Sequence, residues 1–322
     1  MKRELLILVA TFTVLILISM SASATPLADS DFTGDGLNIT EEKEAGTNPF
    51  TNDTANTGVS DYDAVNIYKI DPKDDEIRIT DLDSETFESD NNIHNSNPLS
   101  DGTWGGAVST DTSGDGISDT MSEDVDKIDT DTKDIIVEID WHENAEPELI
   151  PLLKTQQEFH SSPTNSDMKL HFVINDEPRI SESKINHLEY SDIQSELGIN
   201  DNGMHHAAFV EESYFNDEKV GGFALLNTEG FVVAESNGDS MGGLFMHELG
   251  HSIGLWPELY DGIDSFVDID DYPSIMNYEM MEKCYSKEDV EHCYTFDDGV
   301  GFDDWGYIDE NYDEYAPSTK NA

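Results

Sequence analysis

The sequence predicts an α/β (α+β) domain with a mixed sheet over residues 131–322, preceded by a small loop-rich module over residues 25–130. Two observations support this division. Residues 25–130 are polar, contain few long apolar runs, and repeat short loops that combine aspartate with glycine. From Asp134 onward, short apolar runs rich in β-branched residues alternate with stretches of helical periodicity. A chain of 322 residues is long enough for one sizeable core and such a module.

Regular elements are expected throughout the second region. Residues 135–139 form an apolar run typical of a buried strand, and residues 148–159 have the apolar spacing of an amphipathic helix. The further expected elements are a strand at 170–174, partly helical structure over 181–197, and short strands at 207–210, 222–226 and 231–234. Residues 227–230 are expected to join the last two strands as a hairpin turn.

Residues 244–255, with the sequence LFMHELGHSIGL, predict a helix with one chemical face and one packing face. His247 and His251 lie one turn apart on the same face, where two imidazoles can bind one Zn²⁺ ion. Glu248 lies beside them, close enough to take a proton from a metal-bound water. The opposite arc is apolar and would anchor the helix in the core; it carries Phe245, Met246, Leu249 and Ile253. The alternative is a buried amphipathic helix with two hydrogen-bonded core histidines.

A second motif follows this helix. Residues 273–278 read Pro-Ser-Ile-Met-Asn-Tyr, with Met276 twenty-five residues after His251. Together with HELGHSIG, this turn resembles the metzincin metallopeptidases, whose zinc helix is followed by a methionine-containing turn beneath the metal. Gly254 matches the glycine at which the helix of that family ends. The resemblance implies a metzincin-like catalytic domain whose last strands border the cleft and pair with an extended polypeptide substrate.

The third metal ligand departs from the family pattern. Metzincins take it six residues after the second histidine, where this chain has Pro257, which cannot ligate. A carboxylate from the following loop can take its place, because zinc also binds carboxylate oxygen. We expect Asp264 in this role, because Gly262 lets the chain bend back towards the helix; Glu258 and Asp261 remain alternatives.

The resemblance also implies a mechanism. The two histidines and the carboxylate hold Zn²⁺, and Glu248 acts as the general base that later returns the proton to the leaving amine. Tyr278 resembles the tyrosine that some metzincins move towards the oxyanion, although a packed turn aromatic is equally compatible with its position. Pro257 favours a different class of function, a calcium-dependent surface or adhesion protein with a decayed peptidase domain.

The first region contains two loops of a calcium-binding type. Residues 31–37 precede Glu41 and Glu42, and residues 111–119 precede Glu123. Oxygen-bearing side chains at loop positions 1, 3 and 5, a glycine at 6 and an acid near 12 suit Ca²⁺. The spacing resembles thrombospondin type 3 repeats, and residues 53–63 resemble a decayed copy that would bind poorly. The expected calcium ligands are Asp31, Asp35, Asp111, Asp115 and Asp119. The alternative is a disordered acidic linker.

The charge of the chain is strongly acidic. Sixteen basic residues against 70 acidic residues give a net charge of −54. Such a surface repels phosphates, so nucleic acid is excluded as a partner. The acids are spread along the chain instead of gathered in a tail, which resembles proteins of extreme halophiles, where molar salt screens the repulsion.

The N-terminus is typical of a secretory signal. Lys2 and Arg3 precede a mostly apolar run over residues 5–20, and residues 22–24 offer a small-residue cleavage site. We therefore expect a signal peptide over residues 1–24 and a secreted or cell-surface protein, with a retained anchor as the alternative. Nothing later in the sequence is long and apolar enough to cross a membrane.

The remaining cysteines and histidines have structural roles in this interpretation. Cys284 and Cys293 are the only cysteines, and in an exported protein a close pair is expected to form a disulfide. His205 and His206 precede a strand and are expected to be ordinary core or surface histidines. The sequence predicts no particular oligomeric state.

Overall fold

The structure is a computed structural model that describes most of the chain after residue 132 and part of the chain before it. The described residues are 30–57, 59–67, 70–74, 92–94, 133–164, 168–174, 178–197, 204–226, 229–235, 238–281, 293–295 and 301–317. Contacts between residues divide the chain into two compact units, Met1–Asp75 and Glu76–Ala322. We expected the boundary near residue 130. The difference arises because β1 (Asn92–His94) pairs with a strand of the second unit.

The first unit is built around two short helical segments. Helix α2 (Ile39–Ala45) begins at Asn38, whose side chain accepts hydrogen bonds from the N–H groups of Thr40 and Glu41, and Glu41 reciprocates in a capping box. The helix ends at Gly46, where φ of +79° favours glycine. A π-helical segment, Asp63–Ile67, follows. Among the described residues of this unit, the buried apolar side chains are those of Leu37, Val59, Ala64 and Ile70.

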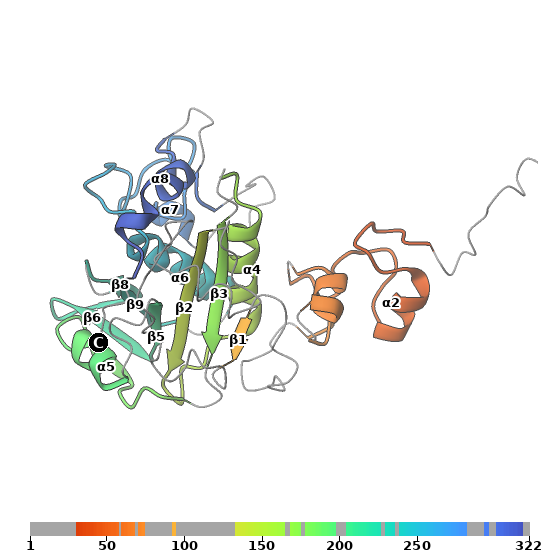
Figure 1. Cartoon of the computed structure of the whole chain (residues 1–322), viewed down its shortest axis with the longest axis horizontal. Coiled ribbons are helices and arrows are strands. Elements are labelled where there is room, and N and C mark those ends of the chain that lie inside the picture. The colour runs from red at the N-terminus through yellow and green to blue at the C-terminus, as the bar shows by residue number, and fades with distance from the viewer. Residues whose placement is uncertain are drawn as a thin grey trace, which may run out of the picture. The chain divides into compact units, whose positions relative to one another are not determined.

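The second unit contains a six-stranded mixed sheet, which confirms a mixed α/β fold (Figure 1). The strand order is β1–β3–β2–β5–β9–β8, with β3 at Met168–Ile174, β2 at Lys133–Trp141, β5 at His205–Phe209, β9 at Gly230–Val233 and β8 at Gly222–Ala224. All neighbours are parallel except β8, which runs antiparallel to β9 at the edge of the sheet. The central strand β2 is buried along almost its whole length, as parallel strands covered on both faces are.

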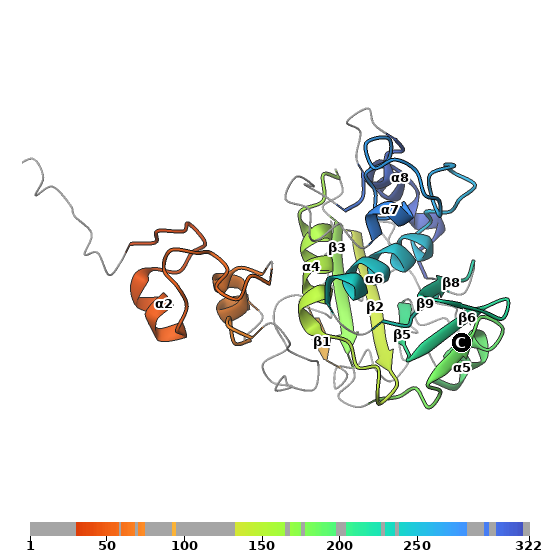
Figure 2. The ribbon, with the colours of Figure 1, turned by 180° about the vertical axis from the view of Figure 1, so that it is seen from behind.

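Helices cover both faces of this sheet. Helices α4 (Leu149–His160) and α6 (Gly238–Ser252) contact each other and lie over one face (Figure 2). Phe245 of α6 anchors this layer, because its ring lies 5.2–6.1 Å from the rings of Phe231, Phe172 and Phe209 on three strands. On the other face, helix α5 (Tyr190–Leu197) packs Tyr190 and Ile193 into an apolar cluster.

Most of the expected elements are present with shifted ends, and several were not expected. The expected strands correspond to β2, β3, β5, β8 and β9, and the expected helices to α4 and α6, although α6 begins at Gly238. The segment 181–197 forms strand β4 (Lys184–Asn186) and α5. A second sheet of order β4–β6–β7 adds β6 (Glu212–Phe215) and β7 (Glu218–Val220), which the sequence did not predict. After α6 come α7 (Tyr278–Met281), α8 (Asp304–Asn311) and a 3₁₀ turn, Tyr312–Glu314.

Three predictions fall outside the described residues. They are the signal peptide over residues 1–24, the calcium loop with Asp111, Asp115 and Asp119, and the position of Cys284. Within the part of the chain that the structure describes, no helix combines the length and the apolar character that a membrane span requires.

Candidate metal site

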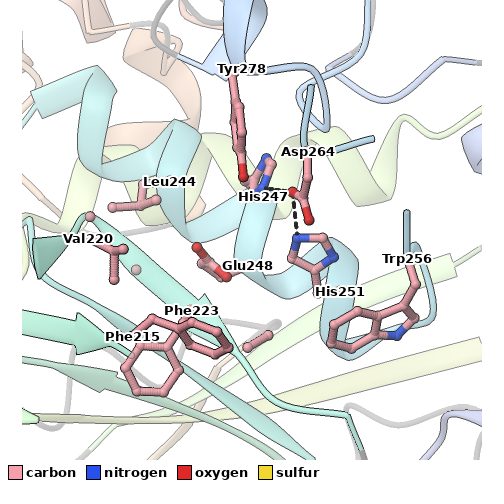
Figure 3. A pocket seen from close by; sticks show the side chains of 13 residues that line it. Phe215, Val220, Phe223, Leu244, His247, Glu248, His251, Trp256, Asp264 and Tyr278 are labelled. Atoms are coloured by element: carbon pink, nitrogen blue, oxygen red, sulfur yellow. Dashed lines mark hydrogen bonds and ion pairs between the residues drawn. The ribbon is translucent and has the colours of Figure 1, made fainter. Parts of the chain in front are cut away.

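Helix α6 carries the chemical residues predicted from the HELGH motif. Its apolar side chains Phe245, Met246 and Leu249 are fully buried, so the orientation of the helix is fixed by the core. The opposite side presents His247, Glu248 and His251 to a cavity (Figure 3). The two imidazole rings lie 4.9 Å apart between centroids, as expected for residues one turn apart.

Asp264 joins the two histidines from the loop that follows the helix. Its Oδ1 atom lies 3.0 Å from Nε2 of His247 and 3.1 Å from Nε2 of His251 (Figure 3). These three side chains form a group whose potential ligand atoms all lie within 4.8 Å of one another. Glu258 and Asp261, the two alternatives considered for this position, are exposed.

The backbone of Asp264 is strained. Its φ of +55° lies in the left-handed region, which residues with a side chain rarely adopt. Such a conformation costs of order 1–3 kcal/mol and persists only where the surroundings hold it. Its N–H donates to the carbonyl of Met276 at 3.0 Å, and the N–H of Tyr278 donates to the carbonyl of Ser265 at 3.0 Å. The loop with Asp264 is therefore tied to the turn with Met276.

Hydrogen bonds to the backbone fix the tautomers of both histidines. Nδ1 of His247 lies 2.9 Å from the carbonyl oxygen of Ile275, and Nδ1 of His251 lies 2.6 Å from that of Leu255. A carbonyl only accepts, so each Nδ1 carries the proton and, in a neutral imidazole, each Nε2 presents a lone pair. Both lone pairs then point at one carboxylate oxygen of Asp264.

This arrangement of acceptors fits a metal ion. Two imidazole lone pairs and a carboxylate oxygen repel one another unless a cation lies between them or both imidazoles take a second proton. Two nitrogens and one oxygen are also a donor set that catalytic Zn²⁺ sites use, with a fourth position left open. Burial alone would raise the pKa of Asp264, but His247 and His251, as donors and positive charges when they take a second proton, hold it well below its usual range. The carboxyl group therefore stays ionised.

Glu248 lies beside this group but does not belong to it. It is buried next to Gly222, where an added Cβ would lie 2.9 Å from its Oε1 atom. Burial, together with the carboxylate of Asp264, raises the pKa of Glu248 to about 8, although His247 and a backbone hydrogen bond from Ala224 act to lower it. A buried carboxyl with a raised pKa next to a candidate metal site is suited to accept and return a proton.

Tyr278 covers the other side of His247. The two rings stack with centroids 5.5 Å apart. Burial raises the pKa of Tyr278, and the carboxylates of Asp264 and Glu248 raise it further, so the phenol stays neutral and can donate a hydrogen bond.

Met276 packs against helix α6 at Gly250. A Cβ added to Gly250 would lie only 2.5 Å from the sulfur of Met276, so this glycine allows the turn to approach α6. Gly254 has φ of +113°, and an added Cβ there would meet the ring of Tyr315 at 2.5 Å. These contacts bring the turn with Met276 and the ring of Tyr315 against the last part of α6 and the residues that follow it.

The cavity in front of these residues has a volume of about 430 Å³. One wall is apolar and the other carries the histidines and carboxylates. The apolar wall comes from β8, the β6–β7 hairpin and α6, through Phe215, Val220, Phe223 and Leu244. Trp256 lines the end of the cavity, where its ring stacks on His251 at 4.8 Å. Neither Phe215 nor Trp256 belongs to a sequence motif, so the sequence predicts no role for either residue.

The other predicted residues lie apart from this cavity. His205 is buried against Ser252 and Tyr312, and His206 against Tyr190, so both are core histidines. Cys293 is disulfide-bonded, and Cys284, which the sequence predicts as its partner, is not among the described residues. In the first unit, Asp35 lies close to Glu42 and Asp61, whereas Asp31 closes its own loop through the N–H groups of Gly34 and Gly36.

No protein-family model matches this chain, and no curated protein matches it in sequence.

Proposed function

We propose that the protein is a zinc-dependent endopeptidase of the metzincin type. One observation carries this proposal: Nε2 of His247 and Nε2 of His251 converge on a single carboxylate oxygen of Asp264, while their Nδ1 atoms are held by backbone carbonyls. The contact of Met276 with Gly250 beneath this group supports the metzincin resemblance.

Each residue has a role in the proposed reaction. His247, His251 and Asp264 hold the metal, and bound Zn²⁺ would supply Lewis acidity and make water a stronger acid. Glu248 takes a proton from the attacking water and passes it to the leaving amine of the peptide. Tyr278 donates a hydrogen bond to the oxygen on which negative charge develops. Its neutral phenol and its stacking on His247 support this role.

A polypeptide is the substrate that the cavity suits best. Strand β8 is the last strand of the six-stranded sheet, and Gly221, Gly222 and Phe223 of this region line the cavity. An extended peptide can add to such an edge through backbone hydrogen bonds, which brings one of its carbonyls to the site. The apolar wall would then accept an apolar side chain of the peptide.

The setting of the enzyme is part of the proposal. We propose export through residues 1–24, a calcium-binding first region, and adaptation to high salt, on the sequence features given above. The alternative, an adhesion protein with a decayed peptidase domain, draws its support from Pro257. Asp264 weakens this alternative, because its carboxylate can serve as the third metal ligand, which Pro257 cannot.

The direct test compares the wild type with Glu248→Gln in molar KCl. The amide keeps the shape of the carboxylate but cannot accept the proton, so hydrolysis of casein should fall by several orders of magnitude while zinc stays near one per chain. Glu258→Gln removes the same charge from an exposed position and should leave the rate unchanged. A zinc-loaded Glu248→Gln protein with wild-type activity would contradict the mechanism, and an inactive wild type with full zinc would favour the decayed domain.

A further inference from the structure

The first unit contains a second cluster of acidic side chains, unrelated to the histidine site. Asp35, Glu42 and Asp61 each offer a carboxylate oxygen within 4.8 Å of the others. The side chains of Glu42 and Asp61 are almost fully buried, each with 1 % of its surface exposed. Buried carboxylates that face one another need a positive partner or strong hydrogen-bond donors.

Hydrogen bonds satisfy only part of this cluster. Asp61 accepts from the N–H and the hydroxyl group of Thr54 at 2.9 and 2.8 Å, and one oxygen of Glu42 accepts from the hydroxyl of Thr47. Oε1 of Glu42 and Oδ2 of Asp35 are buried and have no hydrogen-bond partner. These two buried acceptor oxygens therefore lack the donor or cation that would offset the free-energy cost of their burial.

Among the described residues of this unit, no basic side chain supplies a positive charge to these carboxylates. Lys73 pairs with Asp71 and with the carbonyl of Ala45, and Lys43 is exposed. The cluster is thus costly for the fold as long as three negative charges face one another.

We infer that Asp35, Glu42 and Asp61 form one Ca²⁺ site that joins two segments of the first unit. The sequence predicted a site from Asp31 and Asp35 in one loop, with Glu41 or Glu42 near position 12; this site keeps Asp35 and Glu42, leaves out Asp31 and adds Asp61. Asp31 accepts from the N–H groups of Gly34 and Gly36 at 2.7 and 3.0 Å, so it closes the loop. Asp61 belongs to residues 53–63, the segment whose sequence resembles a decayed, poorly binding copy of the loop.

Local hydrogen bonds explain why Asp61 reaches this cluster. Its N–H donates to the carbonyl of Asn52 at 2.8 Å, and Thr54 holds its carboxylate from the other side. Positions 3 and 5 of this segment are Ala55 and Thr57, and its Asp61 lies instead beside Asp35 and Glu42. Glu42 comes from α2, so a bound ion would fasten this helix to the segment around Asp61.

The chemistry of the ligands selects the ion. Three carboxylates are hard oxygen ligands, which suit Ca²⁺ or Mg²⁺ more than zinc. Ca²⁺ accepts six to eight oxygens in flexible geometry at about 2.3–2.6 Å, whereas Mg²⁺ demands a near-ideal octahedron. Carboxylates on a loop, a helix and a distant segment favour the more tolerant ion. This inference rests on the proposal of a calcium-binding first region but not on the proposed peptidase activity, because it involves the first unit alone.

The test follows amide hydrogen exchange in the full-length chain after removal of divalent ions, in molar KCl. Addition of CaCl₂ to the wild type should slow exchange both in α2 and in residues 52–64. Glu42→Gln should raise the CaCl₂ concentration for half-maximal protection by about tenfold or more, a loss typical of impaired metal sites. Glu44→Gln removes the same charge from an exposed position of α2 and should leave that concentration unchanged.

Asp61→Asn distinguishes a shared site from a loop that binds alone. A shared site predicts that this variant loses calcium-induced protection in α2 as well as in its own segment. The inference would be overturned if CaCl₂ still protected α2 in the Asp61→Asn variant. It would also be overturned if CaCl₂ did not change hydrogen exchange in either segment of the wild type. Equal protection by the same concentration of MgCl₂ would overturn the assignment of the ion.

Discussion

The backbone N–H of Asp264 donates a 3.0 Å hydrogen bond to the carbonyl of Met276. The same turn also accepts from Nδ1 of His247 through the carbonyl of Ile275. One turn therefore positions both a histidine of the helix and the carboxylate of the loop. The left-handed backbone of Asp264 is held by this link, and its strain is of the kind found where function requires a fixed geometry.

The first prediction concerns the loop carboxylate. Asp264→Ala should lower the affinity for Zn²⁺ by about tenfold or more, because two imidazoles alone leave the site without its third protein ligand. The measurement is competition with a chromogenic chelator at fixed pH and salt. Glu258→Ala and Asp261→Ala are the matched controls, because both carboxylates are exposed, and each should bind zinc as the wild type does. Loss of zinc from Glu258→Ala but not from Asp264→Ala would show that the ligand is misassigned.

The second prediction concerns Tyr278. Tyr278→Phe keeps the ring that stacks on His247 but removes the phenol. We expect kcat to fall roughly 10²-fold with little change in KM or zinc content, as for the loss of one oxyanion donor. Tyr260→Phe, outside the cavity, should be neutral. An unchanged kcat would mean that Tyr278 is a packing residue of the turn.

The third prediction concerns Glu248 in the metal-free protein. Its pKa is raised to about 8 in the folded chain, against 4.5 for an unperturbed glutamate. Between these values the folded state binds more protons than the unfolded state, so stability falls as pH rises through this window. Glu248→Gln removes the free-energy cost of ionising this buried carboxyl group in the folded state. Its Tm without metal should therefore exceed that of the wild type at pH 9, and the difference should nearly vanish at pH 4.5.

A Tm difference that is the same at both pH values would contradict this prediction, because a pH-independent effect would come from packing. Glu258→Gln serves as the control, since an exposed glutamate should change Tm little at either pH.

The fourth prediction concerns salt. The chain carries 70 acidic and 16 basic residues, so its surface charges repel one another. The screening length is about 30 Å at 0.01 M salt and about 3 Å at 1 M. Dilution from molar KCl should therefore lower Tm steeply. A Tm that stays constant over this range, measured by circular dichroism with zinc and calcium present, would rule out adaptation to high salt.

The sequence was most informative where the chemistry depends on local spacing. His247, Glu248 and His251 follow from one helical motif, and Gly262 was sufficient to favour Asp264 over its nearer alternatives. Long-range contacts were not predictable in this way. Phe215 and Trp256 reach the cavity from separate elements, and Asp61 reaches Glu42 only because Asn52 and Thr54 hold it in place. The β6–β7 hairpin was missed because its strands are short and polar.

The most direct test of the metal site is X-ray absorption at the zinc edge on the purified chain. The account predicts about one zinc per chain, with only nitrogen and oxygen neighbours at about 2.0–2.2 Å. The outer scattering should fit two imidazoles, which His247 and His251 supply. Sulfur neighbours at about 2.3 Å, or a wild-type chain that retains no zinc, would contradict the central claim.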